Sequence, residues 1–227
     1  MRRRTSRRHV PVAPTLRPIP LPRNLSDVQR PPHQRCWIEH YREAIQTFQD
    51  RWDIPDMEQY VAADFGLVVS TLEYIRDHVP RPDGIAGRFL EWGCGFGLIA
   101  NLAADLGFDA VGIESQEDLI QAGTRVQRSL DTPPSNHAQL EAGNFLPPGA
   151  ERFSDNPLHP SLNHPAADAY DRIGLDLDDF GLIYSYPWPG ENDFHRQVFA
   201  HHAAPGAVHV QFVGPNDVQA WQKTVSF

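Results

Sequence analysis

The sequence contains few cysteines, the residues that cross-link a fold through disulfide bonds. It has two cysteines among 227 residues, Cys36 and Cys94. Two cysteines this far apart, with no metal-ligating neighbours, exclude a disulfide framework and favour a reducing, cytoplasmic compartment. No stretch approaches 18 consecutive apolar residues, which argues against a membrane-spanning helix. With 41% hydrophobic residues, the chain nevertheless has enough apolar side chains to bury the core of one globular domain.

Lysine is nearly absent, and the positive charge is unevenly placed. Lys223 is the single lysine against 19 arginines, and the formal net charge is −9. Residues 1–30 carry eight arginines and one acid, a charge of +7, so residues 31–227 carry −16. Nucleic acid requires cations along its footprint, which this acidic body lacks. The basic tail can still contact anions, nucleic acid included.

The N-terminal region is rich in proline and arginine. Residues 1–35 contain seven prolines, which fix φ and remove backbone donors, so we expect a disordered tail without a helix. The arginine pair at residues 7–8 is not followed by the apolar stretch of an export signal. Residues 36–84 show apolar residues at steps of three and four and predict two or three N-terminal helices.

Residues 85–227 alternate short apolar strands with amphipathic helices. This alternation predicts an α/β fold with a doubly wound, mostly parallel, Rossmann-like sheet. After the last parallel strand too little chain remains for another helix and strand, so we expect a shortened, antiparallel C-terminal edge. Residues 147–178 interrupt the pattern with five prolines and predict an insert that forms a lid, a binding loop or a disordered segment. The expected strands cover residues 88–92, 110–113, 137–142, 180–184 and 208–213.

The most informative motif lies between the first expected strand and the following helix. It places Glu91 before three alternating glycines, Gly93, Gly95 and Gly97. Alternating glycines allow a sharp turn and a close approach of the backbone to a ligand. Glu114 ends the next strand, where an acid can accept hydrogen bonds from two ribose hydroxyls.

Two cofactors use this arrangement. A nicotinamide dinucleotide prefers G-x-G-x-x-G, but Leu98 occupies the position of the third glycine. The Glu91 carboxylate is also unsuited to a pyrophosphate. It suits a phosphate-free ligand with an ammonium group, such as S-adenosylmethionine.

Residues 89–114 resemble the first two motifs of the class I S-adenosylmethionine-dependent methyltransferases. The resemblance continues to about residue 225 and implies cofactor-binding roles for the matching positions. Glu91 would orient the methionine amino group, Gly93, Gly95 and Gly97 would line the methionine and ribose with Cys94 between them, and Glu114 would hold the ribose. The remaining implied contacts lie at the end of the third strand, where the Asn144 side-chain carbonyl would accept a hydrogen bond from the adenine amine and Phe145 would pack on the adenine.

The fourth expected strand ends in Ser185-Tyr186-Pro187-Trp188. In the resembled family this tip faces the transferring methyl, and amino-methylating members often carry (Asp/Asn/Ser)-Pro-Pro-(Tyr/Phe/Trp) there. Three of the four positions match, whereas Tyr186 replaces the first proline and weakens the case for an amino acceptor. We expect these four residues to be the catalytic, acceptor-side positions, with methyl transfer to a small molecule or protein by proximity and orientation.

Other interpretations remain open. One is a nicotinamide-dependent oxidoreductase, another a non-catalytic, cofactor-binding regulatory protein, and a third a nucleic-acid methyltransferase guided by the basic tail. The spacing of the histidines does not favour a metal site. His159 and His164, in the insert, are interpreted as surface histidines, with a general-base role as the alternative.

Overall fold

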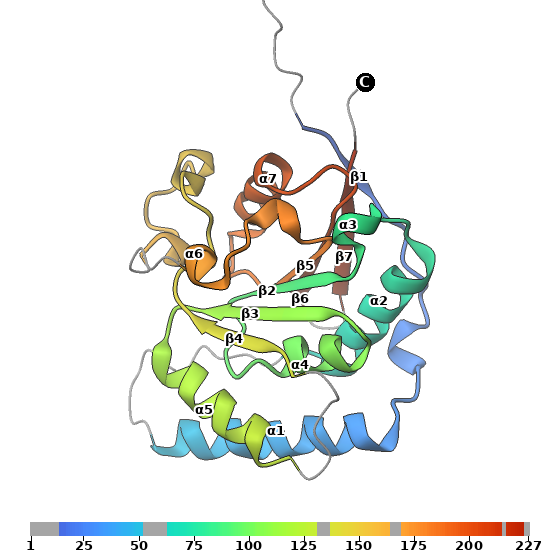
Figure 1. The fold of residues 1–227 in the computed structure, drawn as a ribbon, viewed down its shortest axis with the longest axis vertical. Coiled ribbons are helices and arrows are strands. Elements are labelled where there is room, and N and C mark those ends of the chain that lie inside the picture. The colour runs from blue at the N-terminus through green and yellow to red at the C-terminus, as the bar shows by residue number, and fades with distance from the viewer. Residues whose placement is uncertain (1–13, 52–62, 131–136, 164–168, 215–216, 225–227) are drawn as a thin grey trace, which may run out of the picture.

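The computed structural model describes residues 14–51, 63–130, 137–163, 169–214 and 217–224. Its centre is a seven-stranded sheet in the order β1-β7-β6-β5-β2-β3-β4 (Figure 1). The chain builds β2, β3 and β4 outward in one direction and then crosses back to build β5 and β6 in the other. This reversal confirms the predicted doubly wound fold and creates a topological switch point between β2 and β5, where such folds bind ligands beyond the carboxyl ends of the strands. The strands are β1 Leu16–Pro18, β2 Arg88–Trp92, β3 Asp109–Glu114, β4 Gln139–Ala142, β5 Leu182–Ser185, β6 Val208–Gly214 and β7 Asp217–Lys223.

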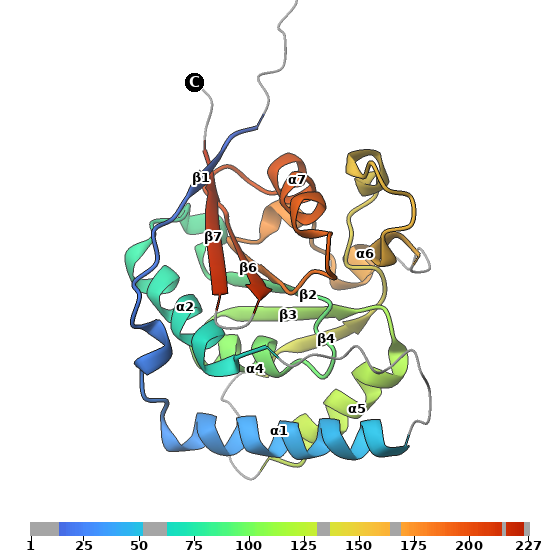
Figure 2. The ribbon, with the colours of Figure 1, turned by 180° about the vertical axis from the view of Figure 1, so that it is seen from behind.

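Helices cover both faces of the sheet, because the parallel strands bury apolar side chains on both sides. One face packs Phe89, Leu182 and Val208 against α1, α2, α4 and α5. The other face packs Leu90 and Ile183 against α6 and α7. Figures 1 and 2 show α1 and α5 on one side of the sheet and α6 and α7 on the other. The α-helices are α1 Pro32–Arg51, α2 Phe65–His78, α3 Asp83–Ala86, α4 Leu98–Asp105, α5 Glu117–Arg128, α6 Ala169–Ile173 and α7 Asn192–His202.

The predicted disordered tail is wrong for residues 14–35. Leu16–Pro18 form β1, which pairs antiparallel with β7. Leu25 is buried in a 3-10 turn (Leu25–Asp27), and Arg30 Nη2 lies 3.1 Å from Glu73 Oε2 on α2. Proline excludes a helix but is tolerated in an edge strand, so the prolines did not exclude this strand. The predicted antiparallel C-terminal strand, β7, is confirmed, but β1 pairs with its outer side and forms the edge of the sheet.

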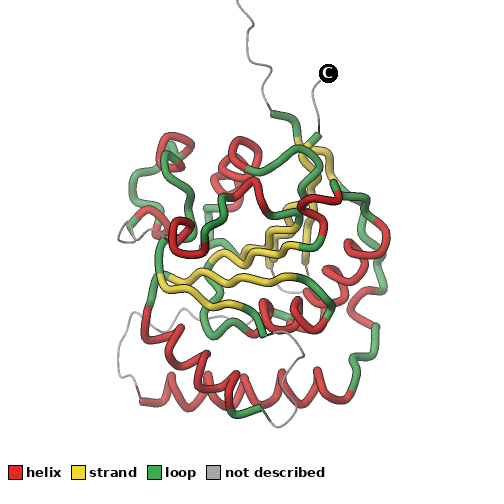
Figure 3. The backbone as a smooth tube through the Cα atoms, viewed as in Figure 1, coloured by secondary structure: helices red, strands yellow, loops and turns green. Residues whose placement is uncertain are grey.

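The insert is also more ordered than expected. Its described residues form 3-10 turns at Ala150–Phe153, Pro160–Leu162 and Leu177–Asp179, in addition to α6. Figure 3 shows this segment as short helical turns joined by loops beside the sheet. The buried Tyr170 of α6 accepts a hydrogen bond from Trp92 Nε1 (3.1 Å) and donates one to the Phe145 carbonyl (2.7 Å). The insert therefore packs onto the sheet as part of its helical layer.

None of the helices in the described residues is both long and apolar enough to cross a membrane.

Candidate functional site

The glycine turn follows β2 at the switch point. Gly93, Gly95 and Gly97 have φ values of 68°, 53° and 75°, the left-handed region that disfavours side-chain-bearing residues. The backbone N–H of Gly93 donates to the Ile113 carbonyl (2.9 Å) at the end of β3. A Cβ on Gly97 would lie 2.4 Å from Leu140 Cδ2. The positive φ values favour glycine at all three positions, and a side chain at Gly97 would also displace that of Leu140, so the turn brings bare backbone to the start of α4.

Cys94, inside this turn, faces the protein interior. It is 5% exposed, and a Cβ on Gly112 would lie 2.8 Å from its Sγ. Burial raises the pKa of the Cys94 thiol well above its usual range, and the nearby Glu91 and Glu114 raise it further. The thiol is thus an unreactive packing group, and backbone contact is the interaction that this position offers a ligand.

Glu91 places a carboxyl group beneath the turn. The residue is 5% exposed, and its Oε2 accepts a hydrogen bond from the Ala100 N–H (2.8 Å) in the first turn of α4. Burial raises the pKa of this carboxyl well above its usual range; the Ala100 hydrogen bond opposes the shift, and Glu114 adds to it. A cation close by would favour the ionised form, so Glu91 is poised to gain from a positively charged ligand.

Glu114 lies at the carboxyl end of β3, where the sequence predicted it. Its Oε2 accepts from the Gly95 N–H (3.0 Å), and its Oε1 accepts from the Gln116 N–H (3.0 Å) and the Ser115 hydroxyl (3.1 Å). A carboxylate has about four acceptor positions, so three are used within the protein. If the Ser115 hydroxyl turns away, two positions become available for two ligand hydroxyls.

The loop after β4 lies against the same turn. The Asn144 side-chain oxygen accepts from the Leu146 N–H (2.9 Å), so the oxygen expected to bind adenine already has one partner. Phe145 is buried, and its ring centroid lies 6.0 Å from that of Trp92 in a stacked pair. Its Cε1 lies 3.8 Å from the Cβ position of Gly93. Phe145 is therefore a core residue that also borders the glycine turn.

The four acceptor-side residues span the last residue of β5 and the loop after it, at the same edge of the sheet, because Ser185 pairs with Trp92 across the switch point. They differ in exposure: Ser185 is 0% exposed, Tyr186 is 37% exposed, Pro187 is buried and Trp188 is half-buried. The Ser185 hydroxyl lies 3.0 Å from His209 Nε2 of β6, so it contacts an internal partner. The structure thus brings all the predicted site residues to one edge of the sheet, with Ser185 on the protein side of it.

Sequence reasoning missed a buried polar cluster beside this tip. Glu191 precedes α7, and its carboxylate accepts from the Ser161 N–H (3.0 Å) and from the Ser161 hydroxyl (2.5 Å). His195, one turn along α7, has its Nε2 at 3.3 Å from Ser161 Oγ. The available signal was the Glu-x-x-x-His spacing at a helix start, but Ser161 comes from the insert, 34 residues from His195.

The insert histidines are placed differently from the expectation. His159 is 8% exposed and its Nδ1 lies 2.9 Å from the Ser154 hydroxyl, so its interpretation as a surface histidine is wrong. His164 lies outside the described residues. Among the residues that the structure does describe, no group of three or more His, Cys, Asp or Glu side chains is arranged to hold a metal ion.

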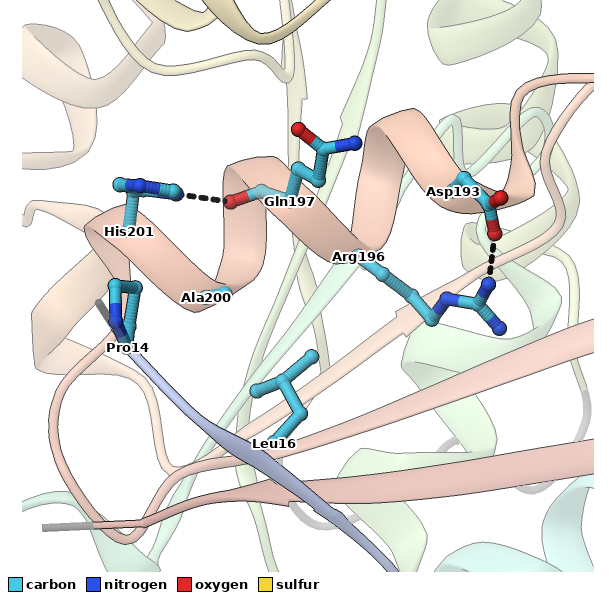
Figure 4. A pocket seen from close by; sticks show the side chains of 7 residues that line it. All are labelled: Pro14, Leu16, Asp193, Arg196, Gln197, Ala200 and His201. Carbon is cyan, nitrogen blue, oxygen red and sulfur yellow. Dashed lines mark hydrogen bonds and ion pairs between the residues drawn. The ribbon is translucent and has the colours of Figure 1, made fainter.

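A separate groove of about 340 Å³ lies between β1 and α7 (Figure 4). It contains neither the glycine turn nor the β5 tip, and within it Arg196 is paired with Asp193. We therefore place the candidate site at the switch point. The groove is lined by Pro14, Leu16, Asp193, Arg196, Gln197, Ala200 and His201.

Comparison with known proteins gave matches among solved structures. No family model and no curated protein matched the sequence. One similar structure is an RNA methyltransferase from Salinibacter ruber in complex with S-adenosyl-L-homocysteine (16% identity, 70% of this chain and 92% of that chain, TM-score 0.45). Another is the S-adenosylhomocysteine-bound methyltransferase PaMTH1 from Podospora anserina (15% identity, 80% of this chain and 62% of that chain, TM-score 0.46). A third is the glycopeptide N-methyltransferase MtfA complexed with sinefungin (16% identity, 70% of this chain and 57% of that chain, TM-score 0.38).

The matched region covers less than two thirds of the second and third of these proteins. At such identities the comparisons concern the fold, and the assignment of a function rests on the residues described above.

Proposed function

We propose that this chain is an S-adenosylmethionine-dependent methyltransferase. The observation that carries the proposal is the Glu91 carboxylate, which is buried beneath the glycine turn and bonded to the Ala100 N–H at the start of α4. A dinucleotide pyrophosphate would need that helix start as its anion site. Here a carboxylate already occupies a donor of the first turn, which disfavours a nicotinamide dinucleotide and favours a cationic ligand without phosphate.

The other residues at the switch point fit the same ligand. In this proposal Glu91 attracts the methionine ammonium group, and the glycine turn lies along the methionine and ribose. Glu114 accepts hydrogen bonds from the ribose hydroxyls, and Asn144 and Phe145 border the adenine. S-adenosylmethionine, when bound, supplies an electrophilic methyl group, so the protein's main task is to bind and orient the two reactants.

The acceptor binds, in this proposal, at the tip formed by Ser185, Tyr186, Pro187 and Trp188. Trp188 is the half-buried aromatic residue of this tip and offers a ring for a planar acceptor. We propose a small molecule or a protein as the acceptor, since the charge of −16 on residues 31–227 opposes an extended nucleic-acid contact. An amino group remains one option for the atom that is methylated.

A methyl-transfer screen tests the proposal. The full chain is incubated with methyl-tritiated S-adenosylmethionine and, separately, with the small-molecule, protein and RNA fractions of a cell extract. We expect label in the small-molecule or the protein fraction with the wild type and with Glu117→Gln, an exposed control, but much less with Glu114→Ala. Cofactor binding without transfer to any fraction would instead indicate a non-catalytic binding protein.

A further inference from the structure

His195 is a buried side chain near the switch point with one ring nitrogen in contact with polar partners and the other without one among the described residues, a pattern that it shares with His209. The residue is 2% exposed, and its Nε2 lies 3.3 Å from Ser161 Oγ and 3.6 Å from Glu191 Oε2. Its Nδ1 is buried and has no hydrogen-bond partner within the described part of the chain. A buried polar atom without a partner is costly, so this nitrogen requires an explanation.

The contacts of Ser161 determine which nitrogen of His195 carries the proton. Burial favours a protonated Glu191, but its hydrogen bonds with His195 and Ser161 outweigh that effect and hold the pKa of Glu191 below its usual range, so the carboxylate is ionised and accepts only. The single hydroxyl proton of Ser161 therefore goes to Glu191 Oε2, 2.5 Å away. Ser161 Oγ can then only accept from His195 Nε2, which must carry a hydrogen. The Nδ1 atom is left with a free lone pair.

The His195 ring packs against two aromatic residues next to the glycine turn. The His195 ring centroid is 5.5 Å from that of Trp92 and 5.6 Å from that of Phe145. Trp92 directly precedes the glycine turn, and Phe145 borders Gly93. Glu191, which anchors the cluster, follows the acceptor-side tip within the same connection between β5 and α7. His195 thus packs against residues that border the glycine turn, and it lies on the helix that follows the acceptor tip along the chain.

We propose that His195 is the general base of the methyl transfer, held in its active tautomer by the Ser161–Glu191 pair. As the acceptor atom bonds to the methyl carbon, it loses its proton to His195 Nδ1, while the electron pair of the broken sulfur–carbon bond stays on sulfur. The positive charge on the imidazolium is then balanced through Ser161 by Glu191. This assignment rests on the proposed function and narrows it to an acceptor atom that gives up a proton as it reacts.

Protonation of the free nitrogen would prevent this role. Burial lowers the pKa of His195, and Glu191 counters this in part. Two further histidines interact electrostatically with the ring: His159 of the insert lowers the pKa of His195, and His195 lowers the pKa of His209 on β6. The base is therefore available at neutral pH, and transfer is expected to fall only as the pH drops below neutrality. Because this nitrogen is buried in the structure, the proposal requires that binding of the acceptor exposes it.

One test does not depend on activity. Long-range nitrogen–proton NMR of the histidine-labelled full chain, without cofactor, reports the tautomer of each imidazole, and loss of one set of signals in His195→Asn assigns them. We expect a neutral ring protonated at Nε2 at pH 7, and an altered tautomer balance or shift in Ser161→Ala. A ring protonated at Nδ1, or an imidazolium at pH 7, would overturn the proposal.

The second test uses the label-transfer assay with the fraction that the wild type methylates. We expect His195→Asn to lose at least about 100-fold in rate, the usual contribution of a general base, with S-adenosylhomocysteine affinity unchanged by calorimetry. Added imidazole should restore part of the activity of His195→Gly, and His201→Asn, an exposed change on the same helix, should behave as wild type. A wild-type rate in His195→Asn would overturn the base alone, whereas a wild type that neither binds cofactor nor transfers label would overturn the proposed function as well.

Discussion

Replacement of Glu114 by glutamine tests the cofactor assignment at its most specific contact. The change removes the negative charge and converts one acceptor oxygen into a donor. Because the carboxylate accepts from the Gly95 and Gln116 N–H groups, the new amide must face one of them donor to donor. We expect a loss of stability of about 1–3 kcal/mol from that mismatch. The ribose would also lose its charged acceptor, worth about 1.5–3 kcal/mol, or about 10- to 150-fold in dissociation constant.

Comparison of two ligands separates the loss of stability from the loss of the ribose contact. Calorimetry compares S-adenosylhomocysteine with its 2′,3′-dideoxy analogue on the wild type, on Glu114→Gln and on the exposed control Glu117→Gln. We expect the wild type and the control to prefer the ribose form, and Glu114→Gln to lose most of that preference. Equal losses for the two ligands would show that Glu114 acts on the turn rather than on the ribose, and unchanged affinity for both would refute the contact altogether.

Three further changes follow from the same geometry. The positive φ alone should make Ala cost about 1–2 kcal/mol at Gly93. Ala at Gly97 should cost at least as much, because its Cβ would also require the Leu140 side chain to shift, and thermal unfolding should show both losses; a wild-type melting temperature for either variant would contradict this. Burial raises the pKa of Glu91, so the folded protein loses stability as the pH rises through that pKa and the buried carboxyl group ionises. Melts at pH 5 and pH 8 should therefore show Glu91→Gln gaining on the wild type at the higher pH while binding S-adenosylhomocysteine more weakly, and a pH-independent difference would argue against the buried, raised carboxyl. Trp188→Ala should impair methyl transfer while calorimetry shows nearly intact cofactor affinity, since its ring is assigned to the acceptor; an equal loss of both would make Trp188 structural.

The parts of the fold that were predicted correctly depend on signals close together in the sequence. The β2 strand, the glycine turn and α4 are contiguous, and Glu114 follows within the next strand. The periodicity of their apolar residues and the positions of their glycines determine local structure, so the central βαβ unit and the doubly wound fold class were predictable.

The errors arose where distant segments pair. Leu16 pairs with Lys223, a contact that no local sequence pattern predicts. The prolines around β1 led to a prediction of disorder instead. The Ser161–His195 contact likewise joins the insert to α7. A serine in a loop with prolines carries no sequence signal of a buried hydrogen bond, so this part of the candidate site emerged only from the packing of the insert on the sheet.

The central claim is that the glycine turn and its two carboxylates bind S-adenosylmethionine rather than a dinucleotide. Calorimetric titration of the full chain with S-adenosylmethionine and, separately, with NAD⁺ tests it most directly. The buried Glu91 at the start of α4 predicts saturable binding of S-adenosylmethionine and no measurable binding of NAD⁺. Saturable binding of NAD⁺, with none of S-adenosylmethionine, would contradict the assignment.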